Sequence, residues 1–530
     1  MTKRTIAAMT LAAAMAFTAA VPAAAFAADE TKYSITMETT ANHAYTSYQI
    51  FKGDLYETGE GTNKTKTLSN IEWGDAADDS LLTALKADTA LGSKFTSCNT
   101  AADVAGVLEK CSEAEMHDIA IIIGRNLKTG ATGVSTSEKV TAGYYLIKDT
   151  TNATAMPEGQ TYSEFILEVV SDVKVQAKDE TVTSGKTVTE TDDTTASVKT
   201  GQKAADYDIG DSVPYELTFK LPSKYASYSK YPVTFIDDMC PGLTYNNDAK
   251  IYFGNTTGEG TAIAFTEDTS ATSEYGGTVY QYSIADLKTA AGASSLAAGD
   301  TVTIRYTATL NDSAAVNKNG NPNTYSVKFA NDPTFNGTGD APTGVTPEDT
   351  AVVFTYEVVF NKVDDENNAL TGADFMLEKN INGTWTDVTG INSGEGALNP
   401  VKTGDTSGST FSFRGLDAGE YRLKEITTPG GYNTIEPIEF RVEATKTTTG
   451  DIETNVTGLS GNDASGKITL TPTFDDDDAK LEADIQNKKG VILPGTGGIG
   501  STLFYSFGAL MIGAAAVLFI TKKRMAAREQ

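Results

Sequence analysis

Short runs in which apolar and polar residues alternate recur through most of the chain, and they limit the fold more than any other feature of the sequence. Residues 212–219, 301–306 and 325–329 are typical, and turns rich in Gly, Asn and Asp separate such runs. A period of two places one row of side chains against a core and the opposite row in solvent. The sequence therefore predicts a mainly β chain of sandwich domains made from half-buried strands.

The length of the chain and its changes in texture predict three domains in series. About 460 residues lie between two apolar ends, which is too many for one hydrophobic core. The domains are expected at 28–180, 181–350 and 351–490. The first should be strand-rich with a helical insert, because 81–91 and 102–109 have helical rather than alternating patterns.

Both ends of the chain carry apolar segments that serve export and membrane insertion. Residues 1–27 combine two basic residues, an apolar stretch and small residues at Ala25 and Ala27, which is typical of a secretory signal peptide. Residues 500–521 are uncharged and mostly apolar, and basic residues follow at once, as in a transmembrane helix with a cytoplasmic end. The chain is therefore expected to be exported, with the precursor held in the membrane by residues 500–521.

The net charge of −28 and the scarcity of histidine exclude several classes of function. So acidic a surface repels nucleic acid. Neither His43 nor His117 stands beside a recognisable nucleophile motif, so ordinary hydrolase chemistry is not expected. The acidic run 475–478 lacks the glycine-spaced ligand pattern of a calcium loop and is interpreted as a solvated loop. We predict no metal site and no cofactor.

Three cysteines, Cys98, Cys111 and Cys240, are too few and too scattered for a metal cluster or a disulfide framework. A bridge between Cys98 and Cys111 is compatible with an oxidising compartment outside the cell, and it would leave one odd thiol. The sequence leaves the state of all three thiols open.

A short motif precedes the apolar C-terminal segment and reads Leu493, Pro494, Gly495, Thr496 and Gly497. Proline keeps the backbone extended, so that a narrow groove can bind it with little loss of entropy. With the apolar helix and the basic tail behind it, the motif resembles the LPxTG cell-wall sorting signal. The resemblance implies that a sortase cysteine attacks the Thr496 carbonyl and passes the acyl group to an amine of peptidoglycan or of another subunit.

Further motifs resemble those of sortase-assembled major pilins, the backbone subunits of Gram-positive pili such as type 2 fimbriae. Residues 421–432 resemble the pilin E-box, and the block that begins at 359–364 resembles collagen-adhesin (Cna) B-type domains. Residues 172–179 resemble a degraded pilin motif. The resemblance implies that Lys178 accepts the acyl group of the next subunit, with Lys174 as the alternative, and that the domains are immunoglobulin-like sandwiches.

Domains of this family commonly join a lysine of the first strand to an asparagine of the last strand as an amide, with loss of ammonia, beside a buried carboxylic acid. Burial lowers the pKa of the lysine, which frees a neutral amine, and raises the pKa of the acid, which keeps a proton to polarise the amide. For the C-terminal domain the resemblance implies Lys362, Asn487 and Glu425. The N-terminal domain lacks a glutamate at the E-box place, so no internal bond is predicted there.

The middle domain resembles Cna A-type domains through residues 208–215 and 235–245 and through the run that ends at Asn331. The resemblance implies Asn331 as the acceptor amide and Asp237 as the acid. The attacking amine remains open among three lysines: Lys186, which fits the first strand best, Lys199 and Lys203.

Together, the resemblances imply the backbone subunit of a covalently linked cell-surface pilus, polymerised by a class C sortase, anchored to the wall and supporting adhesion. Expected partners are other copies of the chain, pilin-specific and housekeeping sortases, peptidoglycan, ancillary pilins and a surface ligand that the sequence does not identify. The only chemistry expected of the chain itself is autocatalytic bond formation. Two alternatives stay open: an ancillary tip or base pilin or a monomeric wall-anchored adhesin, which would not need Lys178, and a wall-anchored enzyme.

Overall fold

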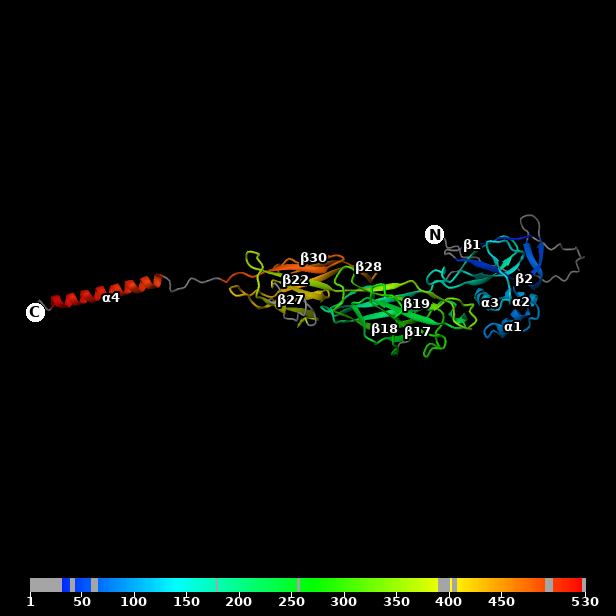
Figure 1. Cartoon of the computed structure of the whole chain (residues 1–530), viewed down its shortest axis with the longest axis horizontal. Helices are drawn as coiled ribbons and strands as arrows, with labels where there is room; N and C mark the ends of the chain where they lie inside the picture. Colours follow the sequence, from blue (N-terminus) through cyan, green and yellow to red (C-terminus); the bar gives the residue numbers. More distant parts are fainter. Residues whose placement is uncertain are drawn as a thin grey trace, which may run out of the picture.

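Three successive groups of β-sheets make an elongated molecule, and a single helix stands apart at its C-terminal end (Figure 1). The predicted mainly β architecture of sandwiches, with a helical insert in the first group, is confirmed. The signal peptide, Lys178 and the sorting motif at 493–497 lie outside the residues that this computed structural model describes. The described ranges are 31–38, 43–58, 65–177, 180–254, 258–388, 401–402, 408–490 and 499–526.

The N-terminal group packs helices against a five-stranded sheet of order β3-β2-β5-β6, with β4 beside β2. Two of the helices begin with capping boxes, at Thr100 with Asp103 and at Ser112 with Glu115, which satisfy the free N–H groups of each first turn. A separate pair, β1 and β7, runs parallel. The elements are β1 (Ile35–Glu38), β2 (Tyr45–Thr58), β3 (Thr65–Trp73), α1 (Asp79–Ala87), the 3₁₀ helix η2 (Gly92–Phe95), α2 (Ala101–Leu108), α3 (Glu113–Arg125), β4 (Val134–Ser135), β5 (Gly143–Asp149), β6 (Glu164–Val169) and β7 (Val173–Gln176).

The middle group is a sandwich of two seven-stranded sheets. One has the order β10-β21-β19-β12-β17-β16 with β20 beside β19, and the other has the order β15-β14-β18-β11-β8-β9 with β13 beside β18. The sheets share one aromatic core, in which the rings of Phe219 and Phe235 from facing strands lie 6.3 Å apart. The elements are β8 (Ser184–Asp192), β9 (Ser197–Gln202), β10 (Ala204–Asp206), β11 (Ser212–Lys220), η3 (Tyr225–Ser227), β12 (Val233–Met239), β13 (Leu243–Tyr245), β14 (Lys250–Phe253), β15 (Thr261–Ala262), β16 (Thr266–Glu267), β17 (Thr278–Ile284), β18 (Thr301–Leu310), β19 (Asn321–Ala330), β20 (Thr343–Val345) and β21 (Asp349–Phe354).

The C-terminal group is a smaller sandwich of a four-stranded sheet, β26-β22-β31-β30, and a six-stranded sheet, β24-β23-β27-β28-β29 with β25 beside β23. Its first strand, β22, runs parallel to its last strand, β31, with Lys362 opposite Ile485. The first and the last strand of the C-terminal group therefore lie side by side. The elements are β22 (Tyr356–Val363), β23 (Asp374–Ile381), β24 (Thr384–Asp387), β25 (Val401–Lys402), β26 (Thr410–Leu416), β27 (Gly419–Thr427), β28 (Ile438–Thr449), β29 (Ile452–Asn462), β30 (Thr471–Phe474) and β31 (Ala479–Gln486).

Buried ion pairs join the middle group to the C-terminal group. The ammonium of Lys379, on β23, lies 2.7 Å from the carboxylate of Asp193 and 2.5 Å from that of Asp208. The ammonium of Lys446, on β28, lies 2.8 Å from the carboxylate of Glu190. Both lysines also pair inside their own group, with Asp417 and Glu453. Separating the two groups would still remove the partners from the middle group, so these ion pairs favour the observed joint.

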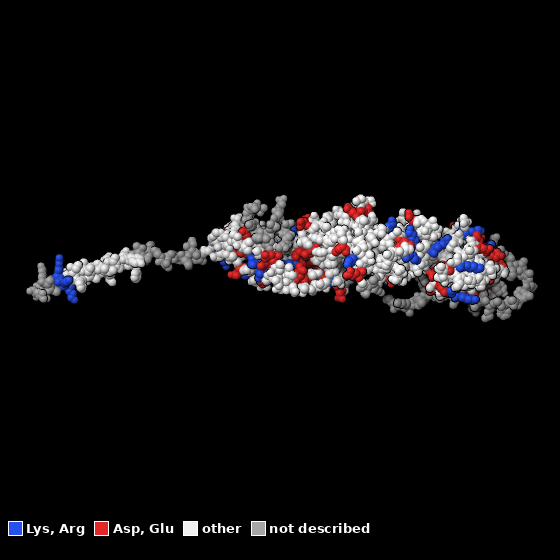
Figure 2. Space-filling model, turned by 90° about the horizontal axis from the view of Figure 1, so that it is seen from below, with Lys and Arg blue, Asp and Glu red and all other residues white. Residues whose placement is uncertain are grey.

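The helix α4 (Ile499–Ala526) packs against none of the described sheets, and the side chains of Phe504–Met525 are exposed. Its segment Phe504–Met525 has a mean hydropathy of 1.9 and is long and apolar enough to cross a membrane. Figure 2 shows the helix as an uncharged shaft with basic residues gathered at its far end. This arrangement confirms the predicted apolar C-terminal helix.

The three cysteines are free thiols, so the suggested bridge between Cys98 and Cys111 is not formed. Cys98 is buried in the core under the helices. The Cys111 thiol instead donates a hydrogen bond to the carbonyl of Val107, four residues earlier, at 3.3 Å. Each sulfur is thus held by its own surroundings.

Candidate functional site

The parallel pairing of β22 and β31 brings Lys362 and Asn487 to the same end of the C-terminal sandwich. Both side chains are completely buried. The Lys362 ammonium donates to the carbonyl of Ile485 at 2.9 Å, and the backbone N–H of Asn487 donates to the carbonyl of Val363 at 3.0 Å. The sequence folds this way because buried residues such as Phe360 and Lys362 alternate with half-buried ones along β22, so that the lysine falls on the inner face.

Glu425 reaches the same place from the opposite sheet, on β27. Its carboxylate accepts a hydrogen bond from the Asn487 side-chain amide at 2.8 Å and another from the backbone N–H of Ile435 at 2.9 Å. The carbonyl oxygen of the Asn487 side chain is buried and has no hydrogen-bond partner among the described residues. The acid, the amide and the amine of the predicted set therefore lie together in the structure.

Burial sets the chemistry of this cluster. It lowers the pKa of Lys362 to about 8, while the charge of Glu425 opposes that shift. A measurable fraction of the amine is then neutral near neutral pH, which is the form that can attack a carbonyl carbon. The arrangement provides a nucleophile, an electrophilic amide and a neighbouring carboxyl group away from water.

A second buried cluster lies between the two sheets of the middle group. The ammonium of Lys186, on β8, lies 2.8 Å from the carboxylate of Asp237, on β12, and both residues have no exposed surface. The rings of Tyr215 and Tyr306 flank the ammonium at 5.1 Å and 5.5 Å. Lys186 and Asp237 therefore occupy the positions that the sequence predicts for the amine and the acid.

Burial shifts both partners of this pair in the direction that amide formation needs. It lowers the pKa of Lys186 to about 8, against the opposing charge of Asp237. It also raises the pKa of Asp237, although the hydrogen bonds from Lys186 and Tyr306 act in the opposite direction. Both shifts favour the neutral amine and the protonated acid.

The structure does not bring Asn331 to this cluster, so Asn331 as the acceptor is a correction to the sequence interpretation. Asp237 faces Tyr325 in the register of β12 with β19, and Asn331 lies six residues further along the chain. At about 3.4 Å per residue, this separation is roughly 20 Å along the strand direction. The Asn331 backbone carbonyl instead accepts a hydrogen bond from the N–H of Tyr162, in the N-terminal group, at 2.8 Å.

Asn323 takes the place that was predicted for Asn331. It lies on β19 beside Tyr325, is completely buried, and donates through its side-chain amide to the hydroxyl of Tyr306 at 2.8 Å. The same hydroxyl donates to Asp237 at 2.8 Å. The carbonyl oxygen of the Asn323 side chain has no hydrogen-bond partner within the described structure.

The two alternative lysines lie elsewhere. Lys199 is exposed and pairs with Glu453 of the C-terminal group. The ammonium of Lys203 lies 2.5 Å from the carboxylate of Asp349. Neither faces Asp237, so Lys186 is the one lysine of the three that fits the cluster.

Sequence reasoning missed Asn323 and Tyr306 because both read as ordinary inward positions of alternating strands. Asn321 and Asn323 lie on β19, and Asn331 directly follows it at the same alternation, so the sequence alone does not distinguish them; the register against β12 places Asn323 two residues from the partner of Asp237. An asparagine that interrupts an otherwise apolar inner face is the signal that the sequence offered. The sequence contains no comparable signal for Tyr306, since tyrosines are common in protein cores.

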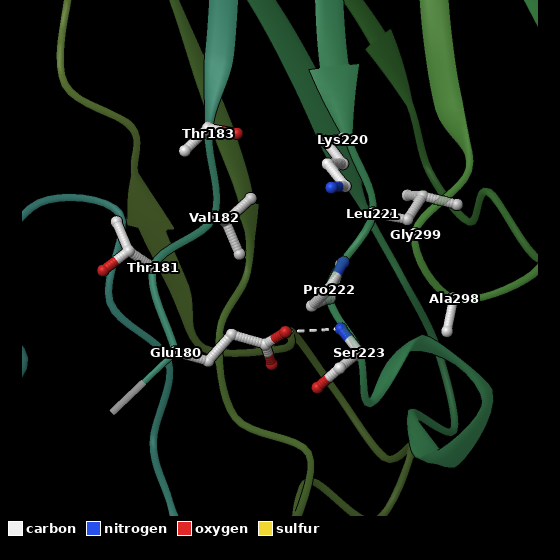
Figure 3. Close-up of a pocket in the computed structure, with 10 residues that line it drawn as sticks. All are labelled: Glu180, Thr181, Val182, Thr183, Lys220, Leu221, Pro222, Ser223, Ala298 and Gly299. Carbon is white, nitrogen blue, oxygen red and sulfur yellow. Dashed lines mark hydrogen bonds between the residues drawn. The ribbon is translucent and has the colours of Figure 1, made fainter. Parts of the chain in front are cut away.

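The predicted acceptor region lies at the other end of the molecule. Lys174 is exposed on β7, opposite Thr36 of β1. A groove of about 440 Å³ opens where the segment after β7 meets the middle group. Figure 3 shows Glu180 reaching across it, where its carboxylate accepts a hydrogen bond from the backbone N–H of Ser223. Glu180 follows Lys178 by two residues, so the groove adjoins the predicted acceptor in sequence.

Comparison with known proteins finds relatives among Gram-positive surface proteins. The family model described as SpaA, prealbumin-like fold domain, matches residues 356–456. The trypsin-resistant surface T6 protein of Streptococcus pyogenes serotype M6 is 28% identical over 376 residues, which cover 60% of this chain. The chain spans 65% of the length of that relative.

Solved structures of pilins resemble the chain over most of its length. The T6 backbone pilin of Streptococcus pyogenes aligns with 87% of this chain and 98% of its own, at 17% identity and a TM-score of 0.47. The major pilin SpaD of Corynebacterium diphtheriae aligns with 87% of this chain and 98% of its own, at 18% identity and a TM-score of 0.44. By sequence, the chain is homologous to a streptococcal surface protein and carries a SpaA-type prealbumin-like domain at residues 356–456.

Proposed function

We propose that the chain is the backbone subunit of a covalently assembled cell-surface pilus. The observation that carries the proposal is the pair of buried lysine–acid–asparagine clusters in two successive sandwiches, in a chain whose sorting motif precedes an apolar helix. Covalent ties of this kind are useful where a protein must bear tension. The homology to the T6 surface protein supports the same conclusion.

Each cluster would form one amide inside its sandwich. The neutral amine of Lys362 attacks the side-chain carbonyl carbon of Asn487, and the carboxyl group of Glu425, hydrogen-bonded to the same amide, would carry the proton from the amine to the departing nitrogen. The amine nitrogen loses a proton, the departing nitrogen gains one, and ammonia leaves. Lys186, Asp237 and Asn323 would react in the same way, and neither reaction needs an external reagent.

The position of the predicted donor and acceptor supports a head-to-tail polymer. The N-terminal group, with β7 and Lys174, and the helix α4 lie at opposite ends of the elongated molecule (Figure 1). A sortase would cleave after Thr496 and pass its carbonyl to Lys178 of another copy, not of the same chain. The groove beside Glu180 offers a place for the incoming segment. A housekeeping sortase would later transfer the fibre to peptidoglycan.

The test replaces the acceptor in cells that carry the complete assembly machinery. Lys178→Ala should abolish the high-mass ladder in boiled detergent extracts of the wall, whereas Lys174→Ala, the matched control on the exposed face of β7, should leave it unchanged. A ladder that persists in Lys178→Ala and disappears in Lys174→Ala would show that Lys174, and not Lys178, is the acceptor. A ladder of this chain that survives the double substitution would rule out both lysines as acceptors, and a ladder that does not contain this chain would contradict the backbone role.

An ancillary pilin or a monomeric wall-anchored adhesin is the second candidate, because it would carry the same sorting motif. A role in adhesion to a surface ligand is expected both of a backbone subunit and of this second candidate. The candidates differ in the partner of Thr496: in a backbone subunit most Thr496 carbonyls are joined to a lysine of another copy, and in an ancillary pilin or a monomeric adhesin they are joined to a different protein or to peptidoglycan. Mass spectrometry of wall digests separates these cases.

A further inference from the structure

The hydroxyl of Tyr306 contacts all three members of the middle cluster. It donates to the carboxylate of Asp237 at 2.8 Å, accepts from the Asn323 amide at 2.8 Å, and lies 3.0 Å from the Lys186 ammonium. Tyr306 lies on β18, and the other three residues lie on β12, β19 and β8. Four strands from both sheets therefore converge on one oxygen atom.

The C-terminal cluster has a different arrangement. There the acid contacts the amide directly, because the Glu425 carboxylate accepts the hydrogen bond of the Asn487 side chain at 2.8 Å. In the middle cluster the acid, Asp237, is bonded to Lys186 and Tyr306, and the Asn323 amide is bonded to Tyr306. In the middle cluster the Tyr306 hydroxyl therefore lies between the acid and the amide, which contact each other directly in the C-terminal cluster.

We infer that Tyr306 is a catalytic residue of the middle-domain bond, which relays a proton between Asp237 and the departing nitrogen of Asn323. This inference rests on the proposed internal cross-link. The neutral Lys186 amine forms a bond to the Asn323 side-chain carbon. The hydroxyl passes its own proton to the amide nitrogen and takes one from Asp237, and Asp237 takes the proton that the Lys186 nitrogen loses. The bond from the Asn323 side-chain carbon to its nitrogen breaks, ammonia leaves, and both Tyr306 and Asp237 end as they began.

The surroundings of the hydroxyl suit a relay. Burial, and next the charge of Asp237, hold the pKa of Tyr306 well above its usual value, so the oxygen keeps a proton to donate. The ring of Tyr306 is fixed by the stacked ring of Tyr215 at 5.4 Å and the edge-on ring of Tyr245 at 5.7 Å. A fixed ring aims the oxygen without further loss of entropy during the reaction.

The experiment follows bond formation in the full chain, made by cell-free synthesis in a mild detergent that keeps α4 in solution. Samples taken over time are digested, and peptide mass spectrometry reports the Lys186–Asn323 and Lys362–Asn487 amides separately. Tyr306→Phe should slow the middle bond by about a hundredfold, within the range for lost proton transfer, and leave the C-terminal bond unchanged. Tyr245→Phe, which removes a hydroxyl from the same aromatic cluster, should form both bonds at the normal rate.

Three outcomes would overturn the inference. A normal rate in Tyr306→Phe would remove the relay and leave the cross-link proposal intact. Equal slowing in Tyr306→Phe and Tyr245→Phe would assign the effect to packing. A wild-type chain without the middle bond would refute the cross-link itself.

The effect of Tyr306→Phe on the stability of the fold is measured separately in a variant that cannot form the middle bond. Thermal unfolding of Lys186→Ala with and without Tyr306→Phe gives the contribution of the hydroxyl to folding alone. We expect the loss of the hydroxyl to change the free energy of unfolding by much less than the activation free energy that corresponds to the change in the rate of bond formation. A large loss of stability in that variant, with no change in rate for the reactive chain, would make the hydroxyl purely structural.

Discussion

Lys362 is a buried amine without a paired carboxylate, and that condition is unfavourable in a finished fold. Its one hydrogen bond among the described residues goes to the carbonyl of Ile485, and the acid of the cluster is bonded to Asn487 instead. A charged ammonium in such a place loses its hydration without full compensation. Conversion to an amide removes the charge, so the reaction relieves a cost that folding creates.

Asn487→Ala should expose this cost as a pH dependence of stability. The variant cannot form the amide, so Lys362 stays an amine with a pKa of about 8 in the fold against 10.5 when unfolded. Above 10.5 the amine is neutral in both states, and below about 8 it is charged in both. The free energy of unfolding should therefore rise by up to about 3 kcal/mol between pH 8 and pH 10.5. Urea unfolding at a series of pH values measures it.

The matched control adds Lys362→Met to Asn487→Ala, which removes the titrating group and keeps the volume. The rise between pH 8 and pH 10.5 should then disappear. An equal rise in both variants would assign the pH dependence to another group.

Asn323→Ala and Asn331→Ala should separate the true acceptor of the middle group from the one that the sequence suggests. The intact mass of Asn323→Ala should fall below the mass calculated from its sequence by one ammonia only, that of the C-terminal bond, because the amide attacked in the middle group is gone. Asn331→Ala should also lose the ammonia of the middle group, like the wild type, because its side chain lies roughly 20 Å away along the strand direction. The reverse result would restore Asn331.

At the scale of elements, the parallel pair β22 and β31 would decide how the C-terminal group bears load in the proposed fibre. Tension would enter through the chain after β31 and leave through the chain before β22. Because a bond between Lys362 and Asn487 joins the far ends of these two strands, the load would pass along β22 alone. The strands between residues 363 and 486 would carry none of it.

Lys362→Ala should therefore turn an inextensible group into an extensible one. In force spectroscopy of single molecules, the variant should show one additional unfolding step that releases roughly 40 nm of chain, and the wild type should lack that step. Lys424→Ala, which removes a half-buried lysine of β27 that pairs with Glu378 and lies outside the cluster, is the control and should behave as the wild type. The same step in the wild type would show that the bond is absent.

The sequence predicted the type of most elements and some of the helices, for reasons that individual segments make plain. Runs such as 212–219 alternate, and they form strands; 102–109 became α2, Ala101–Leu108. The helix α3, Glu113–Arg125, was missed because Ile119 to Ile123 is an apolar β-branched run that resembles a strand. Its capping box at Ser112 was the available signal. The pairing of distant strands such as β22 and β31 depends on long-range packing, so no local sequence pattern predicts it.

At the scale of the whole molecule, the joint between the N-terminal and middle groups contains a buried ionisable pair. The Glu164 carboxylate lies 3.8 Å from the Lys224 ammonium, and both side chains are buried. Arg125, Asp332 and Lys148 are the other charged groups that act on Glu164. Burial raises the pKa of Glu164 to about 7, from an ordinary 4.5, against the charge of Lys224.

This joint should weaken as pH rises from about 4.5 to about 7. Over that interval the unfolded chain has lost the Glu164 proton and the folded joint still keeps it, so stability falls by up to about 3 kcal/mol and then stays level. Thermal unfolding at pH 5 and pH 7.5 measures the difference. Glu164→Gln, which stays neutral, should reduce it, and an unaltered pH profile in that variant would rule out Glu164 as the cause.

The central claim is that Thr496 of one copy is joined to Lys178 of another, and native fibres test it directly. Fibres released from the wall are digested with a protease and searched by mass spectrometry for a branched peptide. The account predicts a peptide in which the Thr496 carbonyl forms an amide with the side chain of Lys178. Fibre digests in which Thr496 is joined only to peptidoglycan fragments, with Lys178 unmodified throughout, would contradict it.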